Sequence, residues 1–321
     1  MVINPMAIAA LIGMLFSAAA HAQNFTGRPL RIIATSTPGS PVDVFSRAIA
    51  EPLSRALGQS IVIDNRVGAG GTLAAGYALN AEPDGQTVLV NTSAHVVSHH
   101  VFPNIGFDLL NDFSGVTPLA ILPNILVVSP QRPWKTVPEL ISAAQAKPGG
   151  YTYGTGGSGT GTHMSAERFR MSAGIAAVQV PYKGTSEVLV DLVAGRIDWA
   201  LVPASSGLAL IREGRVRAIA LAADKRNSQL ADLPTFAELG MKDADFPFWV
   251  GMFVSAKVPR ATVRRLHDET VRVMQLQEVR DRFEKIGGEP FVLSPEAFDT
   301  FLRVQAEAAG TIVKAANIRA N

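Results

Sequence analysis

The sequence predicts an α/β protein made of two doubly wound domains, each with a parallel sheet covered by helices on both faces. Segments of strand length alternate with segments of helical periodicity along most of the chain. The strand segments are apolar throughout, which is typical of parallel strands buried on both faces. The chain has 321 residues, 47% of them hydrophobic, and is long enough to form two cores.

The first 22 residues have the pattern of a secretory signal peptide. Residues 6–20 are apolar or small, and Ala20-His21-Ala22 forms a small-x-small cleavage site before Gln23. Residues 1–5 carry no Lys or Arg, which departs from the usual charged start. A membrane anchor is the alternative, but this run is short for a span, and no later segment approaches the roughly 20 apolar residues needed. We therefore expect an exported mature chain that begins at residue 23.

The first half of the mature chain alternates strands and helices joined by glycine-rich or proline-rich turns. The expected elements are strand 30–35, helix 42–57, strand 61–64, helix 74–80 and strand 87–91. Gly58 ends the first helix, as glycine commonly does just beyond a helical C-terminus. The apolar side chains of that helix recur at helical spacing: Val44, Phe45, Ala48, Ile49, Leu53 and Leu57.

The second half repeats the alternation and ends in helices. The expected elements are strand 124–129, helix 137–146, strand 151–155, a helix from about 162, strand 177–181, helix 186–194, and strands 197–202 and 217–222. Pro259 marks a helix start, followed by apolar positions such as Val263 and Leu266. Ser294 and Pro295 have the pattern of an N-cap and first residue of the last helix.

A glycine-rich turn between residues 154 and 161 is the most informative local feature. Five of these eight residues are glycine and the rest are Ser or Thr. A loop without Cβ atoms lets backbone N–H groups approach a ligand, and the following helix adds unpaired N–H groups and partial positive charge. Together they form a site for a carboxylate or phosphate. The alternative is a turn that needs glycine only for its geometry.

Three strand–turn–helix junctions share this design: residues 38–43, 156–163 and 181–186. Ligands of open α/β sheets bind beyond the carboxyl ends of the strands, at helix N-termini. One junction lies in the first half and two in the second, so a cleft between the domains would bring them face to face. This arrangement predicts a hinged binding protein.

These junctions also carry a resemblance to a known family. The motifs that match run in order along nearly the whole mature chain: Arg28-Pro-Leu-Arg-Ile-Ile, the Pro-Gly-x-x-x-Asp turn ending at Asp43, Ile63-Asp-Asn-Arg-Val-Gly-Ala-Gly-Gly71, Ala81-Glu-Pro-Asp-Gly85, Gly159-Thr-Gly-Thr-His163, Val180-Pro-Tyr-Lys-Gly184, Asp191-Leu-Val-Ala-Gly-Arg-Ile-Asp198 and Leu233-Pro-Thr-Phe-Ala-Glu-Leu-Gly240. Each motif alone is weak, but their order and spacing are specific. The chain resembles the Bug family, the periplasmic solute-binding receptors of tripartite tricarboxylate transporters.

The resemblance implies a periplasmic receptor that captures a small organic carboxylate, aliphatic or aromatic, and delivers it to membrane permease subunits. It implies a type II periplasmic binding fold with crossovers near Leu122 and Trp249. The expected division is a signal peptide (1–22), a discontinuous first domain (23–122 and 250–321) and a second domain (123–249). We expect a monomer that needs no cofactor.

Carried over by position, the resemblance implies ligand contacts from both domains: Pro38, Gly39, Ser40 and Asp43 on one side, and Ser158, Thr160, Thr162, His163, Tyr182, Lys183 and Gly184 on the other. The first turn departs from the family because Ser40 and Pro41 replace the usual small, flexible residues. Ser40 restricts the backbone and adds a hydroxyl, so the direct contacts at this turn are open.

Several of these residues have a plain structural alternative. Thr160 and Thr162 suit helix N-caps, and Asp43 suits a first-turn acid that complements its helix dipole. His163 could be a packed first-turn residue, and Lys183 a solvated surface charge. Tyr182 offers an apolar body with a polar tip.

The histidines at 95, 99 and 100 lie in what we expect to be a loop after the third strand, where Ser93 and His95 would rim the cleft. The spacing of His95 and His99 would place both on one helical face, but a zinc protease needs Glu where this chain has Val96. Phe248 and Trp249 are expected to pack at the hinge, with stacking on an aromatic ligand as the alternative.

Composition and motif spacing argue against other functional classes. The net charge is only +2, so no broad basic surface for nucleic acid is expected, and the chain has no cysteine for thiolate chemistry. Ser158 is not in a Gly-x-Ser-x-Gly elbow, and no acidic residue follows the 177–181 strand to hold a ribose. A secreted α/β enzyme acting on a carboxylated substrate remains the alternative, without a complete catalytic set.

Overall fold

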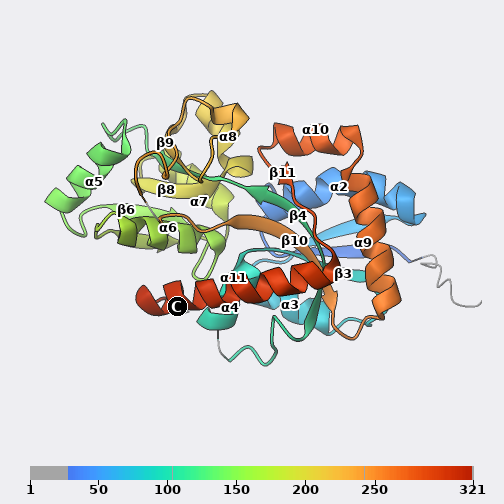
Figure 1. Cartoon of the computed structure of the whole chain (residues 1–321). Coiled ribbons are helices and arrows are strands. Elements are labelled where there is room, and N and C mark those ends of the chain that lie inside the picture. The colour runs from blue at the N-terminus through green and yellow to red at the C-terminus, as the bar shows by residue number, and fades with distance from the viewer. Residues whose placement is uncertain (1–27, 103, 242, 320–321) are drawn as a thin grey trace, which may run out of the picture.

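The computed structural model describes residues 28–102, 104–241 and 243–319, which form two α/β domains side by side (Figure 1). The predicted signal peptide lies outside the described residues. No helix in the described ranges is both long and apolar enough to span a bilayer. Each domain contains one sheet, and the two strands β4 and β10 run next to each other where the chain passes between the domains.

The first domain has a six-stranded sheet in the order β11-β4-β10-β3-β1-β2. Its strands are β1 (Leu30–Ala34), β2 (Ile61–Asn65), β3 (Thr87–Thr92), β4 (Phe113–Leu122), β10 (Phe248–Ser255) and β11 (Glu289–Pro290). The helices that cover it are α2 (Pro41–Leu57), α3 (Thr72–Leu79), α4 (Ala94–Val101), α9 (Arg260–Met274), α10 (Gln277–Lys285) and α11 (Pro295–Ala315), with the short η1 turn (Ala69–Gly71) before α3.

The second domain has a five-stranded sheet in the order β7-β6-β8-β5-β9. Its strands are β5 (Asn124–Val128), β6 (Thr152–Thr155), β7 (Val178–Pro181), β8 (Trp199–Pro203) and β9 (Arg217–Ala222). Its helices are α5 (Val137–Ala146), α6 (Gly161–Ser172), α7 (Thr185–Val193) and α8 (Ala204–Arg212), followed by the η2 turn (Ser228–Leu230).

The predicted parallel pairing is confirmed for β1 with β2 and β3 and for β6 with β7 and β8, but both sheets also contain antiparallel strands. β10 is antiparallel to β3 and β4, and β5 is antiparallel to β8 and β9. β5 and β10 are each the first strand that the chain forms after passing from one domain to the other. They therefore start at the junction and run away from it, whereas β1, β3, β6 and β7 end there. An apolar run does not indicate whether a strand is parallel or antiparallel to its neighbours, because a strand buried on both faces is apolar in either orientation.

The expectation of a loop after β3 is wrong, because residues 94–101 form α4. Strands β4, β10 and β11 and helices α8 and α10 were not predicted as elements, although crossovers were expected at Leu122 and Trp249. The predicted cap of the last helix is confirmed: the Ala297 N–H donates to Ser294 Oγ (3.2 Å), and Pro295 is the first helical residue.

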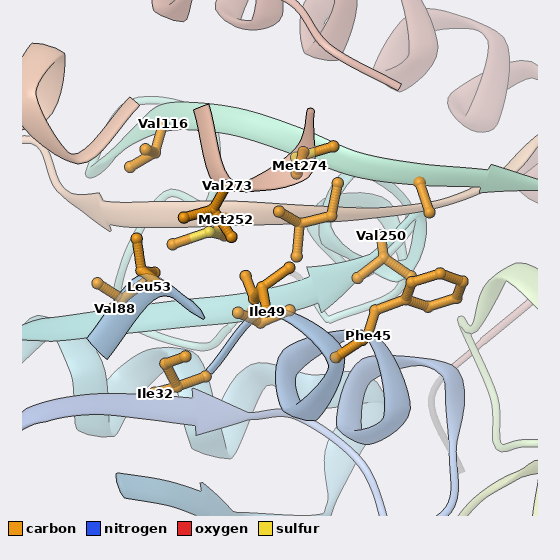
Figure 2. Close-up of a cluster of buried hydrophobic side chains, with 14 of the residues drawn as sticks. Ile32, Phe45, Ile49, Leu53, Val88, Val116, Val250, Met252, Val273 and Met274 are labelled. Carbon is orange, nitrogen blue, oxygen red and sulfur yellow. The ribbon is translucent and has the colours of Figure 1, made fainter. Parts of the chain in front are cut away.

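The apolar face predicted for the first helix builds one side of the first-domain core. Figure 2 shows Phe45, Ile49 and Leu53 of α2 beside strand and α9 side chains, and all three are fully buried. The opposite face of the sheet is covered by α3, α4 and α11. The long α11 packs against α4 and reaches α6 of the second domain (Figure 1).

Candidate functional site

A cavity of about 370 Å³ lies between the two domains. The strands β1, β3, β6 and β7 end at it, and β10 begins at it. Its lining from the first domain is Thr35, Ser36, Pro41, Val42, Gly68, Ala69, Gly70, Gly71, Asn91, Thr92, Ala94, Phe102 and Phe248. Its lining from the second domain is Gly156, Gly157, Ser158, Thr160, Thr162, Pro181, Tyr182, Lys183, Gly184 and Thr185. Six of the residues proposed from the sequence therefore meet at one cavity, and all six belong to the second domain.

The hydroxyls of Thr160 and Thr162 are bonded to the glycine-rich loop itself. Thr160 Oγ1 donates to the Gly157 carbonyl (2.7 Å) and caps α6 by accepting from the His163 N–H (3.4 Å). Thr162 Oγ1 accepts from the Gly156 N–H (2.9 Å) and lies 3.0 Å from Thr160 Oγ1. Because the single Thr160 proton is used by Gly157, Thr162 is the donor between the two hydroxyls. The Thr162 proton can thus turn toward a ligand without leaving a carbonyl unpaired.

Backbone donors of the same loop are available to a ligand. The N–H groups of Gly157 and Ser158 donate to no other group in the described chain, although both residues line the cavity. Both residues are half-exposed, so these N–H groups can bond to water or to a ligand. The loop therefore offers two amide donors next to the Thr162 hydroxyl.

His163 supports this loop from behind and does not line the cavity. Its ring accepts at Nδ1 from the Gly159 N–H (3.3 Å), and its side chain is buried. Burial lowers the pKa of His163 to about 4, so the ring is neutral at pH 7. A neutral ring is needed here because a protonated Nδ1 could not accept from Gly159.

The segment from Tyr182 to Gly184 leads into α7, with Gly184 at the N-cap position. Tyr182 Oη donates to Asp191 (2.6 Å), which leaves only the ring to face the cavity. Burial, together with this carboxylate, raises the pKa of Tyr182 above its usual range. The Lys183 N–H donates to Glu187 Oε2 (3.1 Å), which ties the segment to the first turn of the helix.

The four residues proposed in the first-domain turn do not line the cavity, although Pro41 and Val42 of the same junction do. Pro38 and Gly39 are exposed, and Ser40 is buried without lining the site. Asp43 accepts from the Gly39 N–H (2.9 Å) and from Arg47 (3.0 Å). Burial alone would raise the pKa of Asp43, but these hydrogen bonds outweigh it and lower the pKa. Asp43 thus has a structural role in the turn, which agrees with the alternative interpretation of Asp43 as a first-turn acid.

Ser93 and His95 lie behind the cavity rather than at its rim. Ser93 is fully buried, and its hydroxyl has no hydrogen-bond partner within the described chain. His95 stacks on Phe253 (ring centroids 4.0 Å apart), and its Nε2 hydrogen-bonds the Leu109 carbonyl (2.8 Å). Burial lowers the pKa of His95 to about 4. The prediction that His95 rims the cleft is therefore wrong, since α4 turns this ring into the core.

The glycines of the second-domain loop allow the two domains to approach closely. A Cβ added at Gly161 would lie 2.3 Å from Ser93 Oγ and 3.0 Å from the Phe248 ring. A Cβ at Gly184 would lie 2.5 Å from Thr37 Oγ1. All three neighbouring side chains belong to the first-domain sheet or to the turns that follow its strands, so these glycines leave room for the facing domain.

The electrostatics of the cavity suit an anion. The N-termini of α2, α3, α4, α6 and α7 all contribute residues to its lining, and each carries partial positive charge. Hydroxyl and amide groups supply most of its polar side chains. Among the described residues that line it, Lys183 is the one charged side chain. The site can bind an anion, and its lining shows no complete acid–base or nucleophile set.

Comparison with known proteins identifies the family. A profile described as "Tripartite tricarboxylate transporter family receptor" matches residues 45–318. The chain belongs to this family. BugT from Bordetella pertussis is similar to this receptor: the two are 27% identical over 306 residues, which cover 93% of this chain and 94% of BugT. The resemblance to the Bug family is therefore confirmed.

Two solved structures from Rhodopseudomonas palustris share the fold of this receptor. One was solved with adipate: it is 30% identical, with a TM-score of 0.88 over 92% of this chain and all of that one. The other is MatC with bound malate: it is 27% identical, with a TM-score of 0.85 over 90% of this chain and all of MatC. The expected two-domain type II architecture is confirmed by these matches and by the two sheets.

Some lining residues of this receptor were missed by sequence reasoning. The turn at Gly68–Gly71 follows β2 and precedes α3, which is the same strand–turn–helix pattern used for the other junctions. It could have been found by applying that rule again. Asn91 and Thr92 are polar residues at the end of an apolar strand, which is a weaker signal. Phe248 lines the cavity while Trp249 packs on Phe298 and Phe301, because successive strand residues face opposite sides.

Proposed function

We propose that this protein is a periplasmic receptor that binds a small organic carboxylate in the interdomain cavity and delivers it to the permease subunits of a tripartite transporter. The observation that carries the proposal is the convergence of helix N-termini and neutral donors on a cavity whose described lining residues include no acidic side chain. Such a site stabilises a carboxylate without a full counter-charge.

The relatives support the same class of ligand. The neighbour solved with adipate and MatC with bound malate each have a dicarboxylate, and both cover nearly all of the described chain. Export to the periplasm is supported by the signal-peptide pattern of residues 1–22 and by family membership. Within the lining, the hydroxyls of Ser158 and Thr162 and the N–H groups of Gly157 and Ser158 are the donors that we propose contact the ligand.

The domain boundaries follow from the same proposal. We place the hinge at the two crossovers near Leu122 and Trp249, where β4 is followed by β5 and the chain returns into β10. The first domain is then 23–122 with 250–321, and the second is 123–249, so that Phe248 and Trp249 lie in the hinge although they begin a strand of the first-domain sheet. Binding would draw the domains together, and the closed monomer would be the form that the permease recognises.

A thermal-shift screen of the mature protein (residues 23–321), followed by calorimetry, tests the proposal. The panel holds aliphatic dicarboxylates of increasing length, monocarboxylates, tricarboxylates, aromatic acids and amino acids, with NAD and divalent metals as controls. A ligand that binds only the native state raises the melting temperature by mass action. We expect one class of acid to stabilise the protein and to be recovered unchanged. Turnover of that acid, or a response to NAD or metal alone, would favour a secreted enzyme instead.

A further inference from the structure

We propose that Asn124 and Ser165 are positioning residues, which fix helix α6 and its glycine-rich loop to both crossovers between the domains. Their side chains form one buried hydrogen-bond network with the Phe246 carbonyl. Through this network, the donors that face the cavity keep a defined position relative to the first domain. The inference goes beyond the proposed function and rests on it only for the ligand used in the test.

The network joins three segments that are distant in the sequence. Asn124 is the first residue of β5, directly after the first crossover, and Phe246 lies two residues before β10, at the second crossover. Asn124 Nδ2 donates to Ser165 Oγ (2.7 Å) and to the Phe246 carbonyl (3.3 Å). Ser165 Oγ donates its own proton to the same carbonyl (3.2 Å). One residue of α6 is thus bonded to both connections between the domains.

The three residues of the network are shielded from water. Asn124, Ser165 and Phe246 are 1%, 0% and 3% exposed. Hydrogen bonds away from water are electrostatically stronger, and a buried group that loses its partner is costly. A serine within a helix can bond to a carbonyl of the preceding turn, but the Ser165 proton is used outside α6. The network therefore holds separate segments together rather than stabilising one helix.

Helix α6 also packs against both domains next to this network. Ala166 and Phe169 belong to the second-domain core. Met164 is fully buried in the first-domain cluster, which includes Val97 of α4 and Ile312 of α11. Figure 1 shows α11 reaching α6. The orientation of α6 therefore affects how the two domains meet.

The crossovers themselves have little torsional freedom. Each contains a proline, Pro123 or Pro247, which fixes one backbone torsion angle and restricts the residue before it. The Pro123 carbonyl also accepts from the Ala204 N–H of α8 (3.0 Å). Rotation of one domain on the other must therefore take place about a small number of bonds. The network links these bonds to the helix that carries the ligand donors.

Ser165 lies close to the ligand donors along α6. Thr162 is three residues earlier, and the N–H groups of Gly157 and Ser158 precede the helix. An α-helix rises about 1.5 Å per residue, so roughly one turn separates Ser165 from Thr162. A displacement of Ser165 moves these donors with it. Loss of the network should therefore weaken ligand binding, although none of its residues lines the cavity.

Pulsed electron paramagnetic resonance measures the distance between the domains. The chain has no cysteine, so Ala146→Cys in the second domain and Gln275→Cys in the first provide the two sites for spin labels. Both positions are exposed. The distance distribution is recorded for residues 23–321 in the free state and with adipate, and calorimetry gives the adipate affinity.

The variants to compare are Ser165→Ala, Asn124→Leu and, as a matched control, Ser46→Ala. Ser46 is as buried as Ser165, and its hydroxyl donates to the Val42 carbonyl of its own helix (2.7 Å). The control therefore loses a buried serine hydrogen bond that does not join the domains. Ser165→Ala is the milder change because alanine favours a helix, and it decides the question if Asn124→Leu does not fold.

We expect Ser165→Ala and Asn124→Leu to widen the distance distribution of the free protein, because α6 is no longer bonded to both crossovers. Adipate affinity should fall about threefold for Ser165→Ala, which keeps the bond from Asn124 to the Phe246 carbonyl. It should fall about tenfold for Asn124→Leu, which loses both Asn124 bonds. Ser46→Ala should leave the distribution and the affinity unchanged.

Three results would overturn the inference. The first is a distribution for Ser165→Ala and Asn124→Leu as narrow as that of the wild type. The second is a wider distribution with unchanged adipate affinity, which would mean that the donors do not depend on the network. The third is an equal effect of Ser46→Ala, which would indicate a general loss of stability. If the wild type does not bind adipate, the proposed function fails for that acid, whereas the distances in the free protein still test the network.

Discussion

The two domains present similar turns to the cleft, yet these turns have different roles. Residues 37–43 and residues 156–163 each join the end of a strand to a helix, and both contain glycine, hydroxyl residues and a polar first-turn side chain. In the first domain the polar side chain, Asp43, is bonded to its own turn and to Arg47. In the second domain, Thr160 and Thr162 line the cavity.

The difference teaches that an acidic side chain in the first turn of a helix weakens the attraction of its N-terminus for an anion. The Asp43 carboxylate occupies the Gly39 N–H of the first turn and adds negative charge there. In the second turn, Gly157 and Ser158 keep free N–H groups next to the cavity, and the first turn of α6 contains no acid. The first turn of α2 therefore carries its own negative charge, whereas the first turn of α6 carries none and attracts an anion more strongly.

The largest expected effect comes from Gly161→Ala, which tests whether the second turn must also fit against the first domain. Alanine favours the helix itself, but its Cβ would lie 2.3 Å from Ser93 Oγ. We expect at least a tenfold loss of ligand affinity by calorimetry, with the melting temperature of the free protein maintained. Small-angle scattering should show that ligand no longer closes the domains.

A double variant controls for other effects of Gly161→Ala. Ser93→Ala alone should change little, because the Ser93 hydroxyl has no partner in the described chain. Combined with Gly161→Ala, it should recover part of the affinity by removing the closest atom. Recovery is partial because the Phe248 ring would still be 3.0 Å from the new Cβ. An affinity for Gly161→Ala equal to that of the wild type would show that this contact does not limit closure.

A smaller effect is expected for Thr162→Val, which tests whether the two threonines of the second turn have different roles. The Thr162 proton is available to a ligand, whereas the Thr160 proton is committed to Gly157. We expect Thr162→Val to weaken binding about three- to tenfold, as for the loss of a hydrogen bond to a charged group. Thr162→Ser should bind like the wild type. Thr160→Val should mainly lower the free energy of unfolding, by about 1 kcal/mol for a lost cap. If Thr160→Val weakened ligand binding more than Thr162→Val does, this assignment would be contradicted.

The smallest effect on binding is expected for Asp43→Asn in the first turn. Affinity should stay within twofold, because Asp43 does not line the cavity. The pKa of Asp43 is lowered in the folded protein, so its charge stabilises the fold above the unfolded pKa near 3.8. We expect Asp43→Asn to lose about 1 kcal/mol of unfolding free energy at pH 7. Denaturant melts should show this difference disappearing as pH falls through the folded pKa, and a pH-independent difference would argue against an ionic role.

Much of the fold could be predicted from local pattern. The face of α2 and the cap of α11 at Ser294 follow from spacing and capping residues alone. The antiparallel direction of β5 and β10 could not be predicted, because strands that are buried on both faces have the same apolar sequence pattern in either direction. Helix α4 was taken for a loop because its sequence, rich in His and Val, has little helical preference without the tertiary packing of His95 on Phe253.

The candidate site shows the same division. The sequence by itself determined where backbone donors could gather, because glycine, threonine and strand–turn–helix order are local properties. The bonds within each turn are also local, because Asp43 and His163 each accept from an N–H four residues earlier. Only the tertiary structure decided which residues of these turns line the cavity. It also decided that Gly161 and Gly184 must be small, because the atoms that they approach belong to the other domain. Contacts between residues distant in the chain depend on how two folded domains meet, which no local pattern contains.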